Sequence, residues 1–211
     1  MADPERGDRA DIEWLRGAAG DARALADLFA RYRSRLKRMV KLRMDPRVQG
    51  RVDASDVVQE AYLEAERQLR DYLNDPQLPV FLWLRLVAGQ RLTVAHRRHL
   101  GAQARDAGRE VSIYRGPVPE ASSAALAAQL LGRLTTPSQA AARAELKLRV
   151  QEALNDLDPI DREVLVLRHF EQLGNAEAAA VLGIGPTAAC NRYVRALERL
   201  RAALGGFPGE V

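Results

Sequence analysis

The stretch Asn175–Leu204, NAEAAAVLGIGPTAACNRYVRALERLRAAL, decides the fold because its pattern predicts two short helices joined at a glycine. Asn175 is a favourable N-cap for the first helix, whose alanines are small enough to let a second helix cross closely. Gly183 suits the tight turn, since glycine adopts a positive φ without the penalty that a Cβ imposes. Pro186 fits the first turn of the second helix, where no amide donor is required. The sequence therefore predicts a helix-turn-helix.

The second helix of this pair has two different faces. Its polar and cationic face has the residue types that contact base edges and phosphates when a helix lies in a major groove. The alternative is a solvated helix, because arginine favours helices and charged runs usually face water. From spacings of four, four and three, we expect the inward residues to be Ala189, Tyr193, Leu197 and Leu200. The residues expected to face outward and contact DNA are Thr187, Cys190, Asn191, Arg192, Arg195 and Arg199.

The composition favours an all-α protein. The 211 residues allow two small domains, and hydrophobic residues make up 47% of the chain with only 5% aromatic. Alanine, leucine and arginine dominate, and all three are good helix formers. Cys190 is the single cysteine, which excludes an intramolecular disulfide and a cysteine-rich zinc site. The sequence contains no evident catalytic set or phosphate-binding glycine loop, so we expect no enzyme activity, no catalytic residue, no metal and no cofactor.

The hydropathy pattern bears on location. No apolar run approaches the roughly 20 residues that a membrane-spanning helix needs. The polar start MADPERGDRAD lacks the apolar core of a signal peptide. We therefore expect a cytoplasmic protein with no membrane partner.

Positive charge is concentrated in one segment. Between Arg31 and Arg51, nine basic residues stand against Asp45 alone, whereas the whole chain has a net charge of only +4. This distribution is typical of a protein that meets polyanions at chosen places. It fits equally well the solvated face of one amphipathic helix.

The N-terminal half predicts a helical domain over residues 10–100. Asp53 is a good N-cap for its second helix, and Asp56, three residues on, complements the exposed amides and the helix dipole. We expect the first helix over residues 21–44 and the third over 81–99, with a proline-containing loop at 72–79 before the third.

The C-terminal half predicts a second helical domain after a linker. Composition shifts to glycine, alanine, serine and proline at residue 101, which indicates a linker. Asp158 followed by Pro159 is a strong helix start. The expected boundaries are a linker at 101–139 with one short helix at 121–131, a domain at 140–204 whose first helix is 140–154, and a frayed tail at 205–211.

The N-terminal motif resembles the signature of a known protein family. Asp53-Ala-Ser-Asp56-Val-Val-Gln59-Glu60-Ala-Tyr62 is similar to the D-x-x-Q-E-x-F/Y signature of region 2.2 in bacterial sigma-70 factors, specifically the small two-domain extracytoplasmic-function group. In that family this helix binds the clamp helices of the large RNA polymerase subunit. The resemblance implies that the residues that bind core polymerase are Asp53, Asp56, Gln59 and Glu60.

The next segment resembles sigma regions 2.3 and 2.4, which open and read the −10 promoter element. The carrying residues are Trp83-Leu84-Arg-Leu-Val87-Ala88 and, further on, Arg97-Arg98. By this likeness the loop at 72–79 captures a flipped base, and its pocket must offset the few kcal/mol that flipping costs. The implied −10 residues are Tyr72, Asn74, Asp75, Arg91, His96, Arg97 and Arg98.

The segment from Leu157 to Arg201 resembles sigma region 4, whose recognition helix reads the −35 element in duplex DNA. The outward positions of the second helix fall where that family makes its base and phosphate contacts. The chain departs from the family where Gln90 replaces a common Asn, Val94 a common Asp and Gly185 a common Ser. Specific roles for the Gln90 and Val94 side chains therefore stay open, whereas Gly185 gives up a side-chain cap at a small cost.

Together these features predict a sigma factor that binds core RNA polymerase and directs promoter-specific transcription initiation. The implied partners are promoter DNA and core polymerase, through the clamp helices of the large subunit and the flap of the second subunit. Whether an anti-sigma factor also binds stays open. One alternative is a helix-turn-helix activator or repressor that acts as a dimer on a palindromic site. Another is a helical adaptor that binds only protein and whose cationic helices are solvated.

Overall fold

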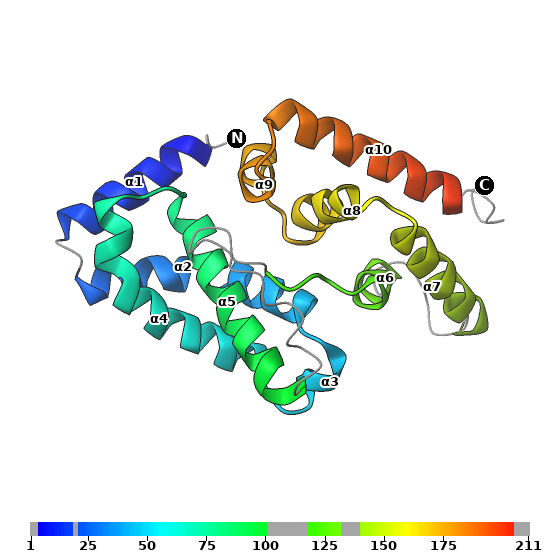
Figure 1. Ribbon diagram of the computed structural model, residues 1–211, viewed down its shortest axis with the longest axis horizontal. Coiled ribbons are helices and arrows are strands. Elements are labelled where there is room, and N and C mark those ends of the chain that lie inside the picture. Colours follow the sequence, from blue (N-terminus) through cyan, green and yellow to red (C-terminus); the bar gives the residue numbers. More distant parts are fainter. Residues whose placement is uncertain (1–3, 19–20, 101–117, 132–139, 205–211) are drawn as a thin grey trace. The chain divides into compact units, whose positions relative to one another are not determined.

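The chain forms helices and no strand in the residues that the computed structural model describes (Figure 1). This confirms the all-α class. The chain divides into two compact units, an N-terminal unit, Met1–Pro119, and a C-terminal unit, Glu120–Val211. The described residues are 4–18, 21–100, 118–131 and 140–204.

The N-terminal unit is built on three long helices, α2, α4 and α5, that pack against one another. Their apolar residues, such as Leu28, Val57 and Leu84, are almost completely buried and form the core of the unit. Burying such side chains is the main favourable contribution to folding. The helices described in this unit are α1 (Pro4–Gly17), α2 (Ala22–Arg43), α3 (Pro46–Gln49), α4 (Ala54–Asn74) and α5 (Val80–Leu100).

Helix α1 precedes the first helix that the sequence pattern predicts. Leu15 of α1 is fully buried, and Asp11 is 5% exposed. The Asp11 carboxylate accepts hydrogen bonds from Arg31, at 2.8 Å, and from the hydroxyl of Tyr32. Because both donors lie on α2, this ion pair ties α1 to the core helices.

The start of α4 confirms the cap predicted from the sequence. The Asp53 carboxylate accepts from the Ser55 backbone N–H at 2.6 Å, and the Asp56 carboxylate accepts from the Asp53 N–H at 3.2 Å. This capping box satisfies amides that have no partner within the helix.

Some basic residues of the segment between Arg31 and Arg51 have partners inside the unit. Arg43 is 2% exposed and donates to the carbonyl oxygen of Pro119 at 2.9 Å. The Arg35 guanidinium lies 3.6 Å from the centroid of the Phe81 ring, a cation–π contact. The segment is therefore neither a single solvated face nor a single polyanion-binding surface.

The C-terminal unit includes the short helix that the sequence places in the linker. This helix, α6, packs on α7, and Arg162 forms an ion pair with Glu120 at 2.8 Å. Residues 101–117 and 132–139 of the predicted linker, and the predicted tail at 205–211, lie outside the described residues. The helices of the unit are α6 (Ser123–Leu131), α7 (Ala140–Asn155), α8 (Pro159–Leu165), the π-helical turn η3 (Val166–Phe170), α9 (Asn175–Leu182) and α10 (Pro186–Leu204).

Helices α9 and α10 form the expected helix-turn-helix. Gly183 has φ of 64°, the left-handed conformation that glycine adopts at low cost. Asn175 is the first residue of α9 rather than its N-cap, which is Gly174, and the Gly174 N–H donates to the Glu177 carboxylate at 2.6 Å. The Asn175 side chain instead donates to the carbonyl oxygen of Pro186 at 2.8 Å. It thus joins the starts of the two helices.

The buried stripe of α10 is rotated from the predicted one. Ala189 and Leu200 are buried as expected, but Ala196 is fully buried while Leu197 is 38% exposed. α10 packs on α7, α8 and α9, and a small residue such as alanine lets a helix approach its neighbours more closely than a leucine would. Three basic residues of α10 lie within ion-pair distance of α8.

Candidate nucleic-acid and polymerase interfaces

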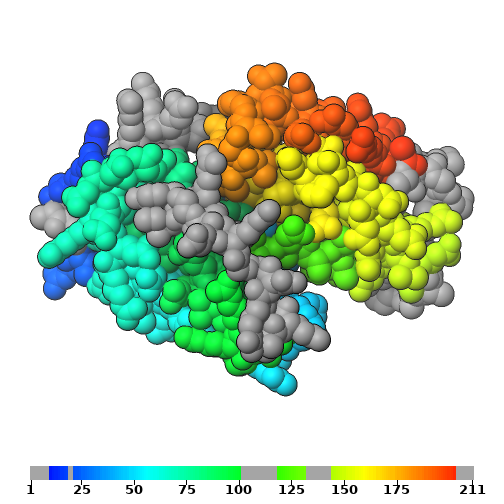
Figure 2. Space-filling view, viewed as in Figure 1, coloured from blue at the N-terminus to red at the C-terminus, as the bar shows by residue number. Residues whose placement is uncertain are grey.

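The first two turns of α10 present three of the predicted DNA contacts to solvent. Thr187, Cys190 and Asn191 are all exposed. In the space-filling view, α10 runs in orange to red along the surface of its unit (Figure 2). In a helix-turn-helix, the N-terminal residues of the second helix are the ones that reach base edges.

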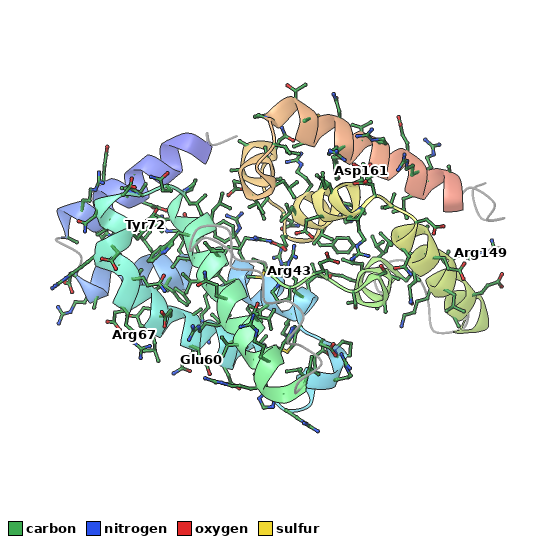
Figure 3. All side chains as sticks on the ribbon, in the orientation of Figure 1. Arg43, Glu60, Arg67, Tyr72, Arg149 and Asp161 are labelled. Carbon is green, nitrogen blue, oxygen red and sulfur yellow. The ribbon has the colours of Figure 1, made fainter. Side chains whose placement is uncertain are left out.

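The three predicted arginines of α10 converge on one buried carboxylate, that of Asp161 on α8 (Figure 3). Asp161 is 1% exposed. Its nearest neighbour is Nη1 of Arg192 at 2.7 Å, followed by Nε of Arg195 at 3.3 Å and Nη1 of Arg199 at 3.8 Å. Sequence reasoning placed these arginines on a purely outward face and missed the shared carboxylate.

The cluster differs in exposure from one arginine to the next. The Arg192 side chain is 29% exposed and also lies 3.5 Å from Asp158, whereas Arg195 and Arg199 are 48% and 53% exposed. A guanidinium carries five N–H donors. Arg195 and Arg199 therefore combine an internal ion pair with a half-exposed guanidinium at the surface of α10.

The predicted polymerase-binding residues share one exposed side of the N-terminal part of α4. Asp53, Asp56, Gln59 and Glu60 are all exposed. The hydrogen bond from the Ser55 backbone N–H lowers the pKa of Asp53, so its carboxylate stays ionised at neutral pH. Asp53 and Asp56 thus have a structural role in the capping box as well as an exposed negative charge.

The basic end of α5 lies beside the acidic residues of α4. Arg98 lies 3.6 Å from Glu60, and Arg91 lies 3.6 Å from Glu64. The Arg98 side chain is 62% exposed, and pairs of this kind are weak because water and salt screen them. Arg97 is exposed at the same end of α5. A phosphate can therefore compete for this end of the helix at little cost.

The predicted loop at 72–79 is shorter in the structure, because α4 continues to Asn74 and α5 begins at Val80. Asn74, the last residue of α4, and Asp75, its C-cap, are exposed, but Tyr72 is not. Tyr72 is 3% exposed, stacks on Trp83 and donates its hydroxyl to the carbonyl oxygen of Leu78 at 2.7 Å. The burial of Tyr72 corrects the expectation that its ring lies in the loop and contacts a flipped base. Its ring is a buried support of the loop, because the stack on Trp83 gives it more apolar contact than the surface offers.

His96 is held inside the N-terminal unit. Its Nε2 accepts a hydrogen bond from the Asp45 backbone N–H at 3.1 Å, which requires the unprotonated ring. Burial lowers the pKa of His96 below its usual value, and the nearby Asp45 carboxylate opposes this effect only in part. A hydrogen bond from the Arg47 side chain lowers the pKa of Asp45 itself to about 2.

The described part of the chain contains neither a helix long and apolar enough to cross a membrane nor a group of three potential metal ligands.

The C-terminal unit carries an exposed polar face on a helix-turn-helix, and the N-terminal unit carries a separate acidic helix face. These features define the class of helix-turn-helix proteins, whose second helix typically lies on DNA.

Comparison with known proteins specifies the class. Residues 147–200 match the family model for sigma-70, region 4. The chain is 31% identical to the RNA polymerase sigma factor CnrH of Cupriavidus metallidurans, over 95% of this chain and 96% of that one. It is 30% identical to the sigma factor CarQ of Myxococcus xanthus, over 95% and 99% of the two chains. It is also 29% identical to the ECF sigma factor SigD of Mycobacterium tuberculosis, over 93% and 84%.

A solved structure agrees with these relatives. The structure of CnrH in complex with the cytosolic domain of CnrY matches with a TM-score of 0.51 at 29% identity, over 92% of this chain and 96% of that one. The chain belongs to the extracytoplasmic-function group of the sigma-70 family. It is an RNA polymerase sigma factor, which binds core RNA polymerase and directs promoter-specific transcription initiation.

Proposed function

We propose that the two units of this sigma factor recognise separate promoter elements. Helix α10 of the C-terminal unit reads the −35 element as duplex DNA. The N-terminal unit binds the clamp helices of the polymerase through α4 and opens the −10 element with α5 and the loop before it. The C-terminal unit also contacts the flap of the second large subunit. Catalysis stays with the polymerase, and the protein works in the cytoplasm.

The observation that carries the −35 assignment is the position of the exposed side chains on α10. Thr187, Cys190 and Asn191 lie in its first two turns, where a recognition helix meets base edges. An Asn side chain pairs well with adenine, and Thr contacts several bases. Arg195 and Arg199 follow one and two turns later, at the distance where a helix in a major groove meets the phosphate backbone.

The polymerase assignment is supported by the surface of α4. Asp56, Gln59 and Glu60 are exposed within the first two turns and are not consumed by the apolar core. Arg97 and Arg98 lie at the end of α5, and Asn74 and Asp75 are exposed where α4 ends. These side chains offer polar contacts to a single strand, whereas Tyr72 supports the loop from below.

A single small basic surface binds DNA weakly at physiological salt, and tethering both units to polymerase raises their effective concentration at the promoter. An anti-sigma partner is part of the proposal, because the matched CnrH structure holds the cytosolic domain of CnrY.

The rival, a dimeric activator or repressor, differs in stoichiometry. It requires two copies on a palindromic site, whereas the proposed mechanism uses one copy on an asymmetric site. The named relatives, all RNA polymerase sigma factors, favour the proposed mechanism.

The test is run-off transcription with reconstituted holoenzyme on a fragment first selected from genomic DNA. Asn191→Ala is expected to lower transcription about tenfold or more, as one lost base contact costs, and to leave binding to core polymerase intact. Glu60→Ala is expected to weaken binding to core polymerase. Glu66→Ala, an exposed acid further along α4, is the matched control and should match the unaltered protein in both assays. The proposal fails if Asn191→Ala transcribes normally and Glu60→Ala binds core polymerase normally.

A further inference from the structure

Asp161 is an acidic side chain that lies almost completely inside the C-terminal unit, beneath α10. We propose that it is a positioning residue for promoter recognition: it fixes Arg195 and Arg199 for contact with the DNA backbone, while Arg192 is its internal partner. This inference rests on the proposed −35 reading by α10 and adds a division of roles among its arginines.

The local structure shows that Asp161 is not needed to cap its own helix. Asp158 is the N-cap of α8, and its carboxylate accepts from the backbone N–H of Ile160 at 2.9 Å and of Asp161 at 3.4 Å. The Asp158 carboxylate therefore already accepts hydrogen bonds from the amides at this helix start. The side chain of Asp161 points instead to α10, where all its ion-pair partners lie.

Burial makes these partners necessary. A carboxylate removed from water is strongly unfavourable unless charged groups and hydrogen bonds replace the lost solvent. Arg192 supplies a hydrogen bond of 2.7 Å and is the least exposed of the three arginines. Arg192 therefore offsets most of the cost of burying the Asp161 carboxylate.

The arginines gain from the carboxylate as well. Arg192, Arg195 and Arg199 are spaced by three and four residues, so they share one face of α10 and repel one another. The single negative charge of Asp161 offsets part of this repulsion and leaves the face cationic. Because Arg195 and Arg199 are held at 3.3 and 3.8 Å and are about half exposed, they meet a phosphate with part of their side-chain freedom already lost.

Charge and positioning predict opposite results for Asp161→Asn. If only charge mattered, removing a negative group near DNA would strengthen binding to every sequence. If Asp161 positions the arginines, the variant loses phosphate contacts and its holoenzyme binds promoter DNA more weakly, although its net charge is more positive. The sign of the change in promoter affinity therefore separates the two effects.

The experiment measures the affinity of holoenzyme for the intact promoter. Asp161→Asn is expected to weaken this affinity about tenfold, the size of effect of one lost contact to DNA. Asp156→Asn removes the same charge at an exposed site of the C-terminal unit and should leave the affinity unchanged or slightly raised. An unchanged or raised affinity for Asp161→Asn overturns the proposal.

A double-mutant cycle with Arg195→Gln distinguishes positioning from simple loss of stability. If Asp161 positions Arg195, replacing Arg195 in the Asp161→Asn background costs much less than in the unaltered protein. Additive losses contradict the proposal. If Asn191→Ala leaves run-off transcription unchanged, the −35 assignment itself fails; if only Asp161→Asn leaves the promoter affinity unchanged, the positioning role alone fails.

Single arginine variants test the division of roles without altering Asp161. The readout is the slope of log affinity against log salt concentration for holoenzyme on the intact promoter. Arg195→Gln and Arg199→Gln are each expected to reduce this slope by about one, the value of one phosphate contact. Arg192→Gln is expected to keep the slope and to lower the protection of α8 and α10 amides from hydrogen exchange. An equal loss of slope for Arg192→Gln and Arg199→Gln overturns the assigned roles.

Discussion

The ring of Tyr72 stacks on the ring of Trp83 with centroids 4.1 Å apart and planes inclined by only 7°. Tyr72 is the last buried residue of α4 and Trp83 lies in the first turn of α5, so the stack joins the two helix ends that flank the loop at 75–79. The Tyr72 hydroxyl adds a hydrogen bond to Leu78 within the loop. The stack and this hydrogen bond thus set the geometry of the loop between α4 and α5.

Tyr72→Phe tests this support. The variant keeps the stack and removes the hydrogen bond to Leu78, so the free energy of unfolding of the N-terminal unit should fall by about 1 kcal/mol. Tyr72→Ala also removes the stack and should lower this free energy by about 3 to 5 kcal/mol. Denaturant unfolding followed by tryptophan fluorescence measures both, since Trp14 and Trp83 both lie in this unit. Equal stability of the two variants would contradict the account.

His96 predicts a pH dependence. Because burial lowers its pKa below the usual 6.5, the unfolded chain binds more protons than the folded one between the folded pKa and 6.5. The free energy of unfolding of the N-terminal unit should therefore fall as pH decreases from about 7.5 to about 5.5. Asp45 does not contribute there, because its pKa of about 2 matters only below its ordinary value of 3.8.

The matched variant for this pH effect is His96→Gln. Glutamine retains a hydrogen-bond acceptor for the Asp45 N–H but does not titrate. Its unfolding free energy, measured by tryptophan fluorescence, should change less over the same pH range. A slope identical to that of the unaltered protein would assign the pH dependence to another group.

Gly89 is predicted to tolerate no side chain. A Cβ at this position would lie 2.5 Å from Cγ2 of Val118, so the packing of Val118 on α5 must shift. Gly89→Ala should destabilise the N-terminal unit by about 1 to 3 kcal/mol despite the better helix propensity of alanine. Gly50→Ala, which meets nothing within 4 Å, is the control and should be neutral or stabilising. Val118→Ala should restore part of the loss in Gly89→Ala.

Gln172 has φ of 59°, a conformation that costs a non-glycine residue about 1 to 2 kcal/mol. Gln172→Gly removes this strain but adds about 0.5 to 1 kcal/mol of chain entropy to the unfolded state. The free energy of unfolding of the C-terminal unit is therefore expected to rise by about 0.5 to 1 kcal/mol. Hydrogen exchange of amides in α8 and α9 measures it, and faster exchange in the variant would contradict the expected sign.

Local signals in the sequence were sufficient for most of the helices. The cap at Asp53, the start at Asp158–Pro159 and the turn at Gly183 depend on residues within one or two turns, and the structure confirms all three. Helix α1 was missed because its start is polar. The clue was the pair Asp11 and Leu15, four residues apart on one face and both buried.

The arrangement around Asp161 could not be predicted from the same signals. Hydropathy favoured Leu197 over Ala196 as an inward residue, but the close approach of α10 and α8 selects the smaller side chain. The ion pairs with Arg192 and its neighbours follow from that rotation. Since they join residues about 30 positions apart, no periodicity within α10 indicates them.

The measurement that tests the separate recognition of two promoter elements most directly uses Cys190, the only cysteine of the chain and an exposed residue on α10. A DNA-cleaving iron chelate attached to Cys190 in the holoenzyme should cut promoter DNA at the −35 element. The same chelate on the Asn74→Cys variant, with Cys190→Ser, should cut near the −10 element. Cutting by both conjugates at one element, or by the Cys190 conjugate at −10, would contradict the account.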